Sequence, residues 1–327
     1  MIISRAPVRV SFFGGGTDYP EYFLQEGGCV LATAIDKYCY VTASSFMSRL
    51  FDYSVRVSYR KVELVQTVGE LEHNVYRECL NLCGLKQDIE LHGVADLPAF
   101  TGLGSSSAFT VSLLQALHGF KGEFLSPFEL AREAIHVERN VLHDNVGCQD
   151  QIMAAFGGFN LIEFRTERDF HVERVPISPV RREQLEQHLL LVFTGIKRKA
   201  SEVVAKQLRR VELNLPTLRT MRAMAYQGRD ILVSPRRPLA EFGELLHEAW
   251  CAKRSLDAGV SNPEIDAMYE CGRKAGALGG KLLGAGGGGF LLFFAPPKAH
   301  PRLLRAFKNQ PTLAVKLDAP GSQIIFS

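Results

Sequence analysis

The segment Pro98–Ala108 constrains the fold of this chain more than any other stretch of its sequence. It reads Pro-Ala-Phe-Thr-Gly-Leu-Gly-Ser-Ser-Ser-Ala and follows residues 88–94, whose alternation of apolar and polar side chains predicts a strand. After it, Val111, Leu114 and Leu117 recur at helical spacing. The pattern therefore predicts a strand, a flexible glycine turn and a helix whose first turn carries three consecutive serines.

A helix that begins in this way has the properties of an anion-binding site. Its first N–H groups have no partner within the helix, and the helix dipole places partial positive charge at the same end. Serine hydroxyls add donors for phosphate oxygens and an oxygen ligand for magnesium. An N-cap needs only one serine, whereas three serines follow two glycines here. We therefore predict a phosphate-binding loop formed by Gly102, Leu103, Gly104, Ser105, Ser106 and Ser107.

Two well-known phosphate-binding motifs do not describe this chain. A Walker A loop needs Gly-Lys followed by Ser or Thr, and Gly280-Lys281 is followed by Leu282. Residues 284–289 match Gly-x-Gly-x-x-Gly, but the apolar run at 290–297 predicts a strand directly after them. A dinucleotide-binding motif needs a helix at that point, so a Rossmann fold is excluded.

Composition limits the classes of protein to which the chain can belong. With 327 residues and 46% hydrophobic content, it can bury two cores. The net charge of +3 is small and the cations are scattered, so we expect no nucleic-acid partner. We also expect no membrane partner, because no apolar run suits a signal peptide or a membrane span. Seven cysteines without CxxC spacing predict reduced thiols and a cytoplasmic protein. The sequence leaves the oligomeric state open.

Strand patterns dominate the first half of the chain, and helix patterns dominate the second. The expected strands cover residues 1–13, 29–44, 53–65, 159–164 and 189–194. The expected helices cover about 69–83, 105–119, 126–141, a short stretch that ends at 155, 199–227, 239–258 and a stretch that starts at 262. Ser126-Pro127-Phe128-Glu129 has the sequence of a capping box. This order predicts an α+β protein with two lobes, which we place at residues 1–185 and 186–327.

Three glycine-containing segments together resemble the GHMP kinase superfamily, named for galacto-, homoserine, mevalonate and phosphomevalonate kinases. They are Arg5–Asp18 (Arg-Ala-Pro-Val-Arg-Val-Ser-Phe-Phe-Gly-Gly-Gly-Thr-Asp), the predicted phosphate loop, and Lys281–Phe290 (Lys-Leu-Leu-Gly-Ala-Gly-Gly-Gly-Gly-Phe). The resemblance implies an N-terminal lobe like ribosomal protein S5 domain 2, a ferredoxin-like C-terminal lobe, and ATP and substrate between them. It also implies that the second segment wraps the ATP phosphates and that the third segment, with Gly286 and Gly287, buttresses them.

The resemblance further implies which residues carry the chemistry of phosphoryl transfer. Glu138 precedes Asp150 by twelve positions, the offset between the magnesium-binding Glu and the base Asp of galactokinases. Carried over, Ser106 and Glu138 would bind Mg²⁺, and Asp150 would accept the proton of the acceptor hydroxyl. Arg9 matches an arginine near that base and would hold Asp150 ionised. Asp144 is a rival for the base, although its surroundings are more typical of a turn.

The first glycine segment carries the expected substrate site. Asp18 matches the position at which galactokinases read sugar hydroxyls, and we assign Gly15, Gly16 and Thr17 beside it to substrate binding. The chain departs from galactokinases because Gly15 and Gly16 replace a Glu-His pair, which argues against galactose itself. This triple-glycine form resembles bacterial D-glycero-D-manno-heptose 7-phosphate kinases, which phosphorylate the anomeric hydroxyl to give the 1,7-bisphosphate.

A sugar that already bears a phosphate needs cations in the substrate site. Lys197 and Arg198 are one candidate set, and Arg77 is another because arginine binds phosphate in a bidentate manner. Helix N-termini are an alternative to both. We therefore expect an ATP- and Mg²⁺-dependent heptose 7-phosphate 1-kinase that serves the synthesis of nucleotide-activated heptose. Two alternatives stay open: a kinase of the same superfamily for fucose or a uronic acid, and a non-catalytic nucleotide- and sugar-binding sensor.

Overall fold

The computed structural model describes residues 1–99, 101–166, 169–197 and 200–327, and it combines strands with helices. The strands are β1 (Ile2–Phe13), β2 (Gly28–Ser45), β3 (Val55–Ser58), β4 (Val62–Val65), β5 (Ile89–Ala95), β6 (Phe159–Phe164), β7 (Phe170–Arg174), β8 (Leu189–Phe193), β9 (Gly279–Leu282), β10 (Phe290–Phe294), β11 (Thr312–Leu313) and β12 (Gln323–Phe326). The helices are α1 (Pro20–Glu26), α2 (Asn74–Leu82), α3 (Ser105–Lys121), α4 (Pro127–Ile135), α5 (Gln149–Phe156), α6 (Pro179–His188), α7 (Ala200–Leu208), α8 (Val211–Val233), α9 (Ala240–Ser255), α10 (Pro263–Lys274) and α11 (His300–Ala306). Short turns of helix lie at η1 (Ser48–Leu50), η2 (Val68–Glu70), η3 (His136–Val141) and η4 (Pro297–Ala299).

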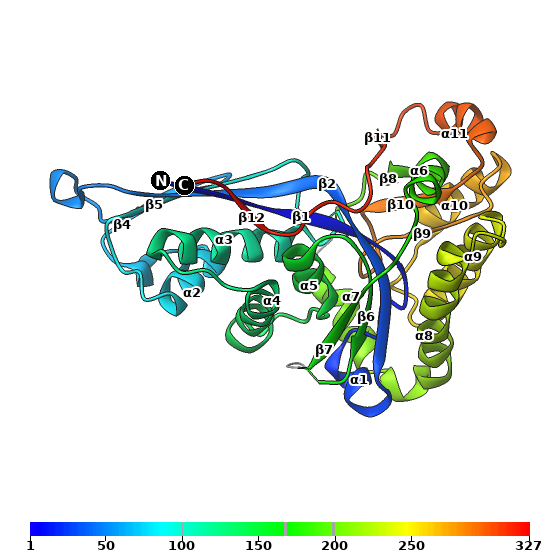
Figure 1. The fold of residues 1–327 in the computed structure, drawn as a ribbon, viewed down its shortest axis with the longest axis horizontal. Helices are drawn as coiled ribbons and strands as arrows, with labels where there is room; N and C mark the ends of the chain where they lie inside the picture. Colours follow the sequence, from blue (N-terminus) through cyan, green and yellow to red (C-terminus); the bar gives the residue numbers. More distant parts are fainter. Residues whose placement is uncertain (100, 167–168, 198–199) are drawn as a thin grey trace.

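Two sheets organise these elements (Figure 1). In the described residues, the larger sheet is 8-stranded, with the order β12-β1-β2-β5-β3-β4 and with β6 paired to β2 and β7 to β6. The smaller, 4-stranded sheet has the order β11-β8-β10-β9. Its pairs are antiparallel, whereas the larger sheet also contains one parallel pair, β3 with β5. The α+β class and the two-lobed organisation are therefore those expected from the sequence.

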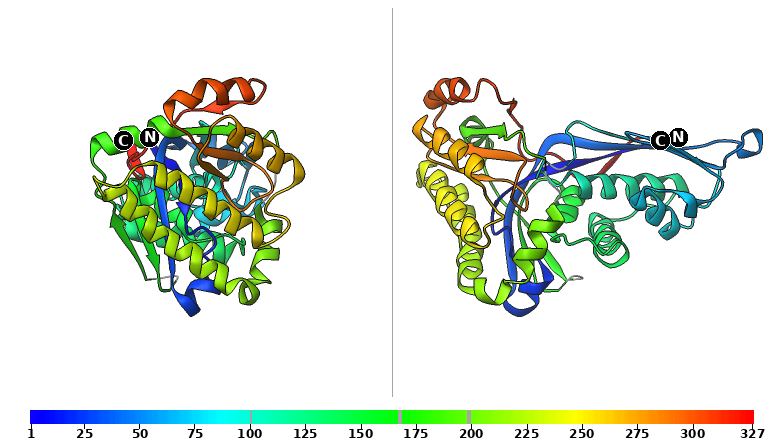
Figure 2. Two further views of the ribbon diagram at one scale, coloured as in Figure 1. Left: turned by 90° about the vertical axis from the view of Figure 1, so that its right-hand side faces the viewer. Right: turned by 180° about the vertical axis from the view of Figure 1, so that it is seen from behind.

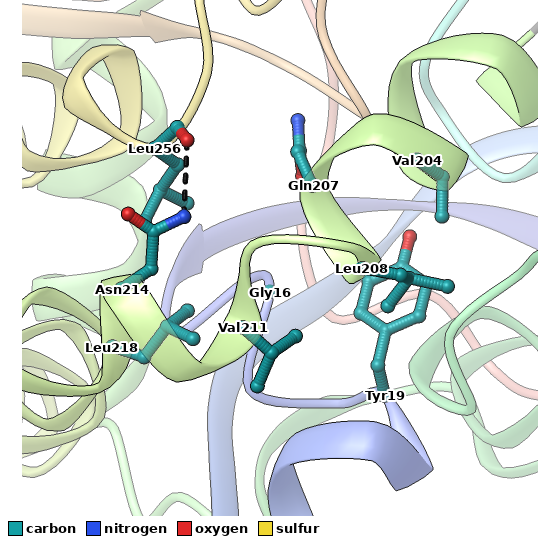
Figure 3. A pocket seen from close by; sticks show the side chains of 9 residues that line it. All are labelled: Gly16, Tyr19, Val204, Gln207, Leu208, Val211, Asn214, Leu218 and Leu256. Carbon is teal, nitrogen blue, oxygen red and sulfur yellow. Dashed lines mark hydrogen bonds between the residues drawn. The ribbon is translucent and has the colours of Figure 1, made fainter.

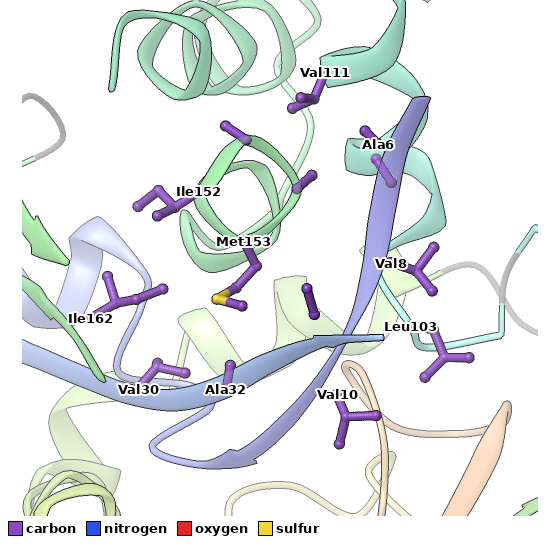
Figure 4. Packing of buried hydrophobic residues seen from close by; sticks show 14 of the residues in the cluster. Ala6, Val8, Val10, Val30, Ala32, Leu103, Val111, Ile152, Met153 and Ile162 are labelled. Carbon is purple, nitrogen blue, oxygen red and sulfur yellow. The ribbon is translucent and has the colours of Figure 1, made fainter. Parts of the chain in front are cut away.

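The long strands β1 and β2 carry the core of the larger sheet. Every residue of β1 from Ala6 to its end is buried, because α3, α5, α8 and α9 all pack on this strand. Figure 4 shows Val30 and Ala32 of β2 near Met153 of α5, and Val8 of β1 near Leu103. Figure 2 shows α8 and α9 lying in front of the blue strands. A charged residue in so enclosed a strand needs a partner, and Arg9 is such a residue.

The capping box at the start of α4 forms as the sequence predicts. The Ser126 hydroxyl accepts a hydrogen bond from the Glu129 N–H (3.3 Å), and the Glu129 carboxylate accepts one from the Ser126 N–H (2.8 Å). The α-helix ends at Ile135 and continues as the π-helical turn η3. Such turns interrupt α-helices frequently at functional sites, and this one carries Glu138.

The structure differs from the expected elements in three ways. Residues 53–65 form the hairpin β3–β4 and not one strand, since the chain turns where the Tyr59 N–H donates to the Lys61 carbonyl (2.9 Å). The expected helix 199–227 is divided into α7 and α8 at Arg209 and Arg210. Finally, several elements are not predicted, namely α1, α6, α11, β7, β9, β11 and β12. In α6 the buried residue is Leu185 alone, so the sequence of this helix contains no apolar stripe from which a helix could be predicted.

The expected boundary between residues 185 and 186 falls within α6, which lies between β7 of the larger sheet and β8 of the smaller one. The C-terminal end of the chain nevertheless returns to the larger sheet, where β12 pairs with β1. Helix α8 also packs on β1 and β2. The N-terminal lobe thus includes β12, and it is in contact with α8, although both elements follow the expected boundary. Among the described helices, none combines the length and the apolar character needed to cross a bilayer.

A buried histidine joins α2, α3 and α4. His118 of α3 contacts Glu133 of α4 through Nε2 (2.8 Å) and Glu123 through Nδ1 (2.9 Å), and the Cys83 thiol after α2 lies 3.9 Å from Nε2. The contact with Cys83, followed by those with the two glutamates, raises the pKa of His118 to about 10. Because this value lies above the unfolded one, His118 stabilises the fold fully below about pH 6.5 and loses this contribution as the pH rises through 10.

We expect the free energy of unfolding of the wild type, minus that of His118→Gln, to shrink by about 2 kcal/mol between pH 6.5 and pH 10, which is about half of the full linkage value because solvent screens the partly exposed Glu123 and Glu133. Denaturant titrations of both proteins across this range measure the difference. His171→Gln is the matched control, because His171 is exposed on β7. A difference between wild type and His118→Gln that does not change with pH would contradict a stabilising charge on His118.

Candidate functional site

The three glycine segments meet at the N-terminus of α3. A Cβ atom on Gly102 would lie 2.5 Å from the Leu283 carbonyl oxygen, and one on Gly284 would lie 2.6 Å from the Gly102 Cα. The Arg9 N–H of β1 donates to the Leu103 carbonyl (3.0 Å). Only glycine allows the second and third segments to approach so closely. Segments that are far apart in the sequence therefore form one site.

The glycines of the third segment contact different parts of the protein. Gly284 contacts the predicted phosphate loop, whereas Gly286 and Gly287 pack against Val260, whose carbonyl accepts a hydrogen bond from the Gly287 N–H (2.9 Å). The N–H of Gly289 donates to the Ile196 carbonyl (2.9 Å). Gly286 and Gly287 thus lie against Val260, next to the glycine that contacts the predicted phosphate loop.

The start of α3 has the geometry predicted for a phosphate loop. Gly104 occupies the N-cap with φ 75°, and it makes no side-chain cap. A Cβ at this position would lie 3.1 Å from Asp150 Oδ2 and 3.4 Å from Arg9 Cζ. In the described chain no side chain caps the first turn, which leaves the N–H groups at Ser105–Ser107 without a side-chain acceptor.

Arg9 and Asp150 form a bidentate ion pair beside this helix N-terminus. The Arg9 Nε and Nη2 atoms each lie 2.7 Å from a carboxylate oxygen of Asp150, and Nη1 donates to the Gly102 carbonyl (2.8 Å). The Arg9 side chain is only 5% exposed, whereas that of Asp150 is 23% exposed. Arginine therefore holds the carboxylate in one orientation, while the carboxylate stays open on one side.

Glu138 lies buried in η3 and faces α3. Its carboxylate accepts hydrogen bonds from the hydroxyls of Ser107 (2.8 Å) and Thr110 (2.7 Å) and from the Gln151 amide. Burial raises the pKa of Glu138 to about 7, and the charge of Asp150 adds to this effect. Ser106, expected beside Glu138, is exposed. The serine that contacts Glu138 is thus Ser107.

The loop between β1 and α1 brings Asp18 to the same place. Its carboxylate accepts hydrogen bonds from the Gly16 N–H (2.9 Å) and from the Gln149 amide (2.9 Å). Burial raises the pKa of Asp18, and the hydrogen bond from Gly16 opposes the change while the nearby charge of Asp150 adds to it. Asp18 and Asp150 therefore lie in one region, as the sequence predicts for the substrate-reading residue and the base.

Thr17 has a different role from the one expected. Its side chain is fully buried, and its hydroxyl donates to the Gly14 carbonyl (2.8 Å) and accepts from the Cys29 N–H (3.1 Å). Both hydrogen-bonding functions thus tie the loop to β2, so its assignment to substrate binding is corrected to one of loop anchoring.

Gly15 and Gly16 leave room beside the Asp18 carboxylate. A Cβ on Gly15 would come no closer than 3.6 Å to a neighbouring atom, the Ser11 hydroxyl oxygen. Gly16 borders a cavity that it shares with Tyr19 and with residues of α7, α8 and the end of α9 (Figure 3). Space is therefore left beside Gly15, whereas a Cβ on Gly16 would lie 3.3 Å from a methyl group of Leu218.

The candidate ligands for a second phosphate are scattered. Lys197 is exposed and follows Ile196, which is bonded to the third glycine segment, while Arg198 lies outside the described residues. Arg77 donates to the Leu71 carbonyl (2.7 Å) and to Glu78 (2.8 Å), and its helix α2 packs on α3 and η3. Lys197 thus follows a residue that is bonded to the third glycine segment, whereas Arg77 is bonded within its own segment.

Two buried lysines of the site were not predicted. Lys281 of β9 donates to the carbonyls of Ser11 and Phe12 (2.9 Å each), and Lys253 of α9 donates to the Gly284 carbonyl. Their exposed fractions are 3% and 6%. A signal for Lys253 exists in the sequence, since it occurs three residues after Trp250 on the apolar stripe of α9, where a lysine is out of place.

Both lobes are similar to known proteins. Residues 63–158 match the GHMP kinases N terminal domain, and residues 234–311 match the GHMP kinases C terminal domain. The chain is 29% identical to the D-glycero-alpha-D-manno-heptose 7-phosphate kinase of Campylobacter jejuni, over 94% of each chain. It is 28% identical to the L-fucokinase/L-fucose-1-P guanylyltransferase of Bacteroides fragilis, over 93% of this chain and 35% of that protein.

Solved structures share the same fold. A D-glycero-D-manno-heptose 1-phosphate kinase from Bacteroides thetaiotaomicron has a TM-score of 0.81 at 24% identity, with 100% of both chains covered. The galactokinase of Lactococcus lactis complexed with galactose has a TM-score of 0.74 at 19% identity, with 98% of this chain and 94% of that chain covered. These similarities confirm the two-lobed fold that the three glycine segments predict.

Proposed function

Because this chain belongs to the GHMP kinases, we propose that it transfers the γ-phosphoryl group of ATP to the anomeric hydroxyl of D-glycero-D-manno-heptose 7-phosphate. The product would be the 1,7-bisphosphate, an intermediate for nucleotide-activated heptose. The 29% identity to the heptose 7-phosphate kinase of Campylobacter jejuni, over 94% of both chains, supports this acceptor. The absence of side chains at Gly15 and Gly16 supports an acceptor other than galactose.

The observation that carries the proposal is the Arg9–Asp150 pair at the N-terminus of α3. The N–H groups at Ser105–Ser107 would bind the ATP phosphates there. Asp150, held by Arg9 and partly exposed, would accept the proton of the acceptor hydroxyl as its oxygen attacks phosphorus. Asp18, in the same region, would bind sugar hydroxyls and hold the acceptor in place.

Magnesium fits the surroundings of Glu138. Its carboxylate is buried, and in the described part of the chain no cationic side chain is paired with it. One carboxylate together with phosphate oxygens and water is a common environment for this ion. Glu138 and a serine hydroxyl, that of Ser107 or of Ser106, would hold Mg²⁺, which supplies neutralisation of the phosphate charge.

The 7-phosphate assignment predicts a large difference between two acceptors. Charge-assisted hydrogen bonds contribute roughly 1.5–3 kcal/mol each. Loss of two such contacts should therefore lower kcat/KM for unphosphorylated heptose by about two to four decades relative to the 7-phosphate. A coupled assay of ADP release with both sugars, with L-fucose and with a uronic acid measures the difference.

Equal kcat/KM for heptose and its 7-phosphate would contradict this acceptor. Preference for L-fucose would favour the second candidate, a fucose kinase, for which the 28% identity to the Bacteroides fragilis enzyme is the specific support. Binding of nucleotide and sugar without ADP release would favour a sensor. The Lys197→Met variant tests the contact with the distal phosphate separately. It should lower kcat/KM for the 7-phosphate and leave kcat/KM for the unphosphorylated heptose unchanged.

A further inference from the structure

Lys253 reaches the phosphate loop from the C-terminal lobe. It lies on the buried side of α9, and its ammonium group donates to the carbonyl of Gly284. Gly284 packs directly on Gly102, whose carbonyl accepts a hydrogen bond from Arg9. The Lys253 ammonium is therefore linked to the Arg9–Asp150 pair through two packed glycines, Gly284 and Gly102.

The second buried lysine, Lys281, serves as a comparison, because its hydrogen bonds hold only the main chain. Lys281 donates to two main-chain carbonyls, those of Ser11 and Phe12. For Lys253, the carbonyl of Gly284 is the sole hydrogen-bond acceptor within the described ranges, although an ammonium group has three donors. Two donors of a 6% exposed cation are thus left for a ligand.

The charges around Lys253 also point to an anionic ligand. Arg9 of β1, Asp18 of the first glycine segment, Asp150 of α5 and Lys281 of β9 all lie near it. Burial, together with the charge of Arg9, lowers the pKa of Lys253 to about 8, and the two aspartates oppose this change. Among described residues no carboxylate forms an ion pair with it. A buried cation without such a partner is costly unless a ligand supplies the negative charge.

We propose that Lys253 is a catalytic residue that donates hydrogen bonds to the phosphoryl group as it passes from ATP to the acceptor oxygen. The proposal rests on the kinase function proposed above. In this step the bond between the acceptor oxygen and phosphorus forms while the bond from phosphorus to the β–γ bridging oxygen breaks. The acceptor proton moves to Asp150, and the bond pair leaves with ADP. Lys253 stays protonated and stabilises charge on the transferring oxygens.

Kinetics of Lys253→Met test the proposal, with the acceptor that the wild type uses best. Removal of one hydrogen-bond donor that stabilises the transition state typically lowers kcat by about 10²-fold. The Kd for Mg·ATP should change by less than about threefold. Arg254→Gln is the matched control, since Arg254 is the next residue of α9 but pairs with Asp266 (3.1 Å) outside the site. Its kcat should equal that of the wild type.

If Lys253 only holds Gly284 in place, the kinetic measurements give a different result. In that case Lys253→Met would weaken Mg·ATP binding and lower the melting temperature while kcat at saturation stays within about threefold of the wild type, and the proposal would be overturned. If the wild type itself releases no ADP with any sugar of the panel, the kinase function fails and not the assignment of Lys253.

A pH profile provides a second readout that does not depend on a folded methionine variant. Because the charged form of Lys253 is required and its pKa is about 8, kcat/KM of the wild type should fall as the pH rises through 8. Lys253→Arg, which keeps its charge at every pH of the assay, should not show this fall. A wild-type profile that stays flat up to pH 9.5 would overturn the proposal.

Discussion

Replacement of Asp150 by Asn is expected to lower kcat by about 10²–10⁴-fold while the Kd for Mg·ATP stays within about threefold of the wild-type value. The amide has the shape of the carboxylate and still offers one oxygen to Arg9, which now binds both carboxylate oxygens at 2.7 Å. It cannot accept the proton of the acceptor hydroxyl. Steady-state kinetics measure turnover, and calorimetric titration with Mg·ATP measures binding.

Asp144→Asn is the matched control for this experiment. Asp144 is exposed and follows η3 in a turn, where its N–H donates to the Glu138 carbonyl (2.9 Å). We expect its kcat to stay within about twofold of the wild type. Should Asp144→Asn be the inactive variant while Asp150→Asn keeps wild-type turnover, the assignment of the base is wrong.

Replacement of Gly104 by Ala should abolish the stabilisation of the fold by Mg·ATP. At a ligand concentration of 100 times the Kd, this stabilisation amounts to about 2.7 kcal/mol in the wild type. Gly104 has φ 75°, and an added Cβ would lie 3.1 Å from Asp150 Oδ2. The methyl group would therefore strain the loop and displace the carboxylate together with Arg9. Thermal melts with and without Mg·ATP measure the effect.

Gly122→Ala separates this effect from simple backbone strain. Gly122 caps the other end of α3 with φ 75°, the same value as Gly104, and no atom lies within 4 Å of its added Cβ. It should lower the melting temperature of the free protein and keep the shift caused by Mg·ATP. A normal ATP-induced shift in Gly104→Ala would contradict a phosphate site at this loop.

Local patterns were sufficient to predict the elements that carry most of the site. The strand, glycine turn and serine-led helix around residues 98–108 follow from side-chain periodicity and from the orphan N–H groups of a helix N-terminus. The capping box at Ser126 follows from a pattern of four residues. In contrast, Arg9 and Asp150 are 141 positions apart, so only the resemblance to a family predicted that they meet.

The remaining residues depend on contacts that periodicity does not define. Whether Ser106 or Ser107 faces Glu138 depends on the helical phase, since Ser107 and Thr110 lie three residues apart on the buried side of α3. Thr17 was misassigned because its hydroxyl binds to a strand twelve positions away. Lys253 was missed because α9 belongs to the other lobe, and only the packing of Gly284 on Gly102 brings the two together.

The most direct test of the proposed kinase function is the fate of the γ-phosphoryl group, followed by ³¹P NMR with Mg·ATP and D-glycero-D-manno-heptose 7-phosphate. We expect the ATP signals to give way to those of ADP while a second sugar-phosphate signal, coupled to the anomeric proton, grows in equal amount. The Asp150→Asn protein should produce neither change on the same time scale. Nucleotide signals that stay constant with folded wild-type protein, or a new ester at any carbon other than the anomeric one, would contradict the assignment.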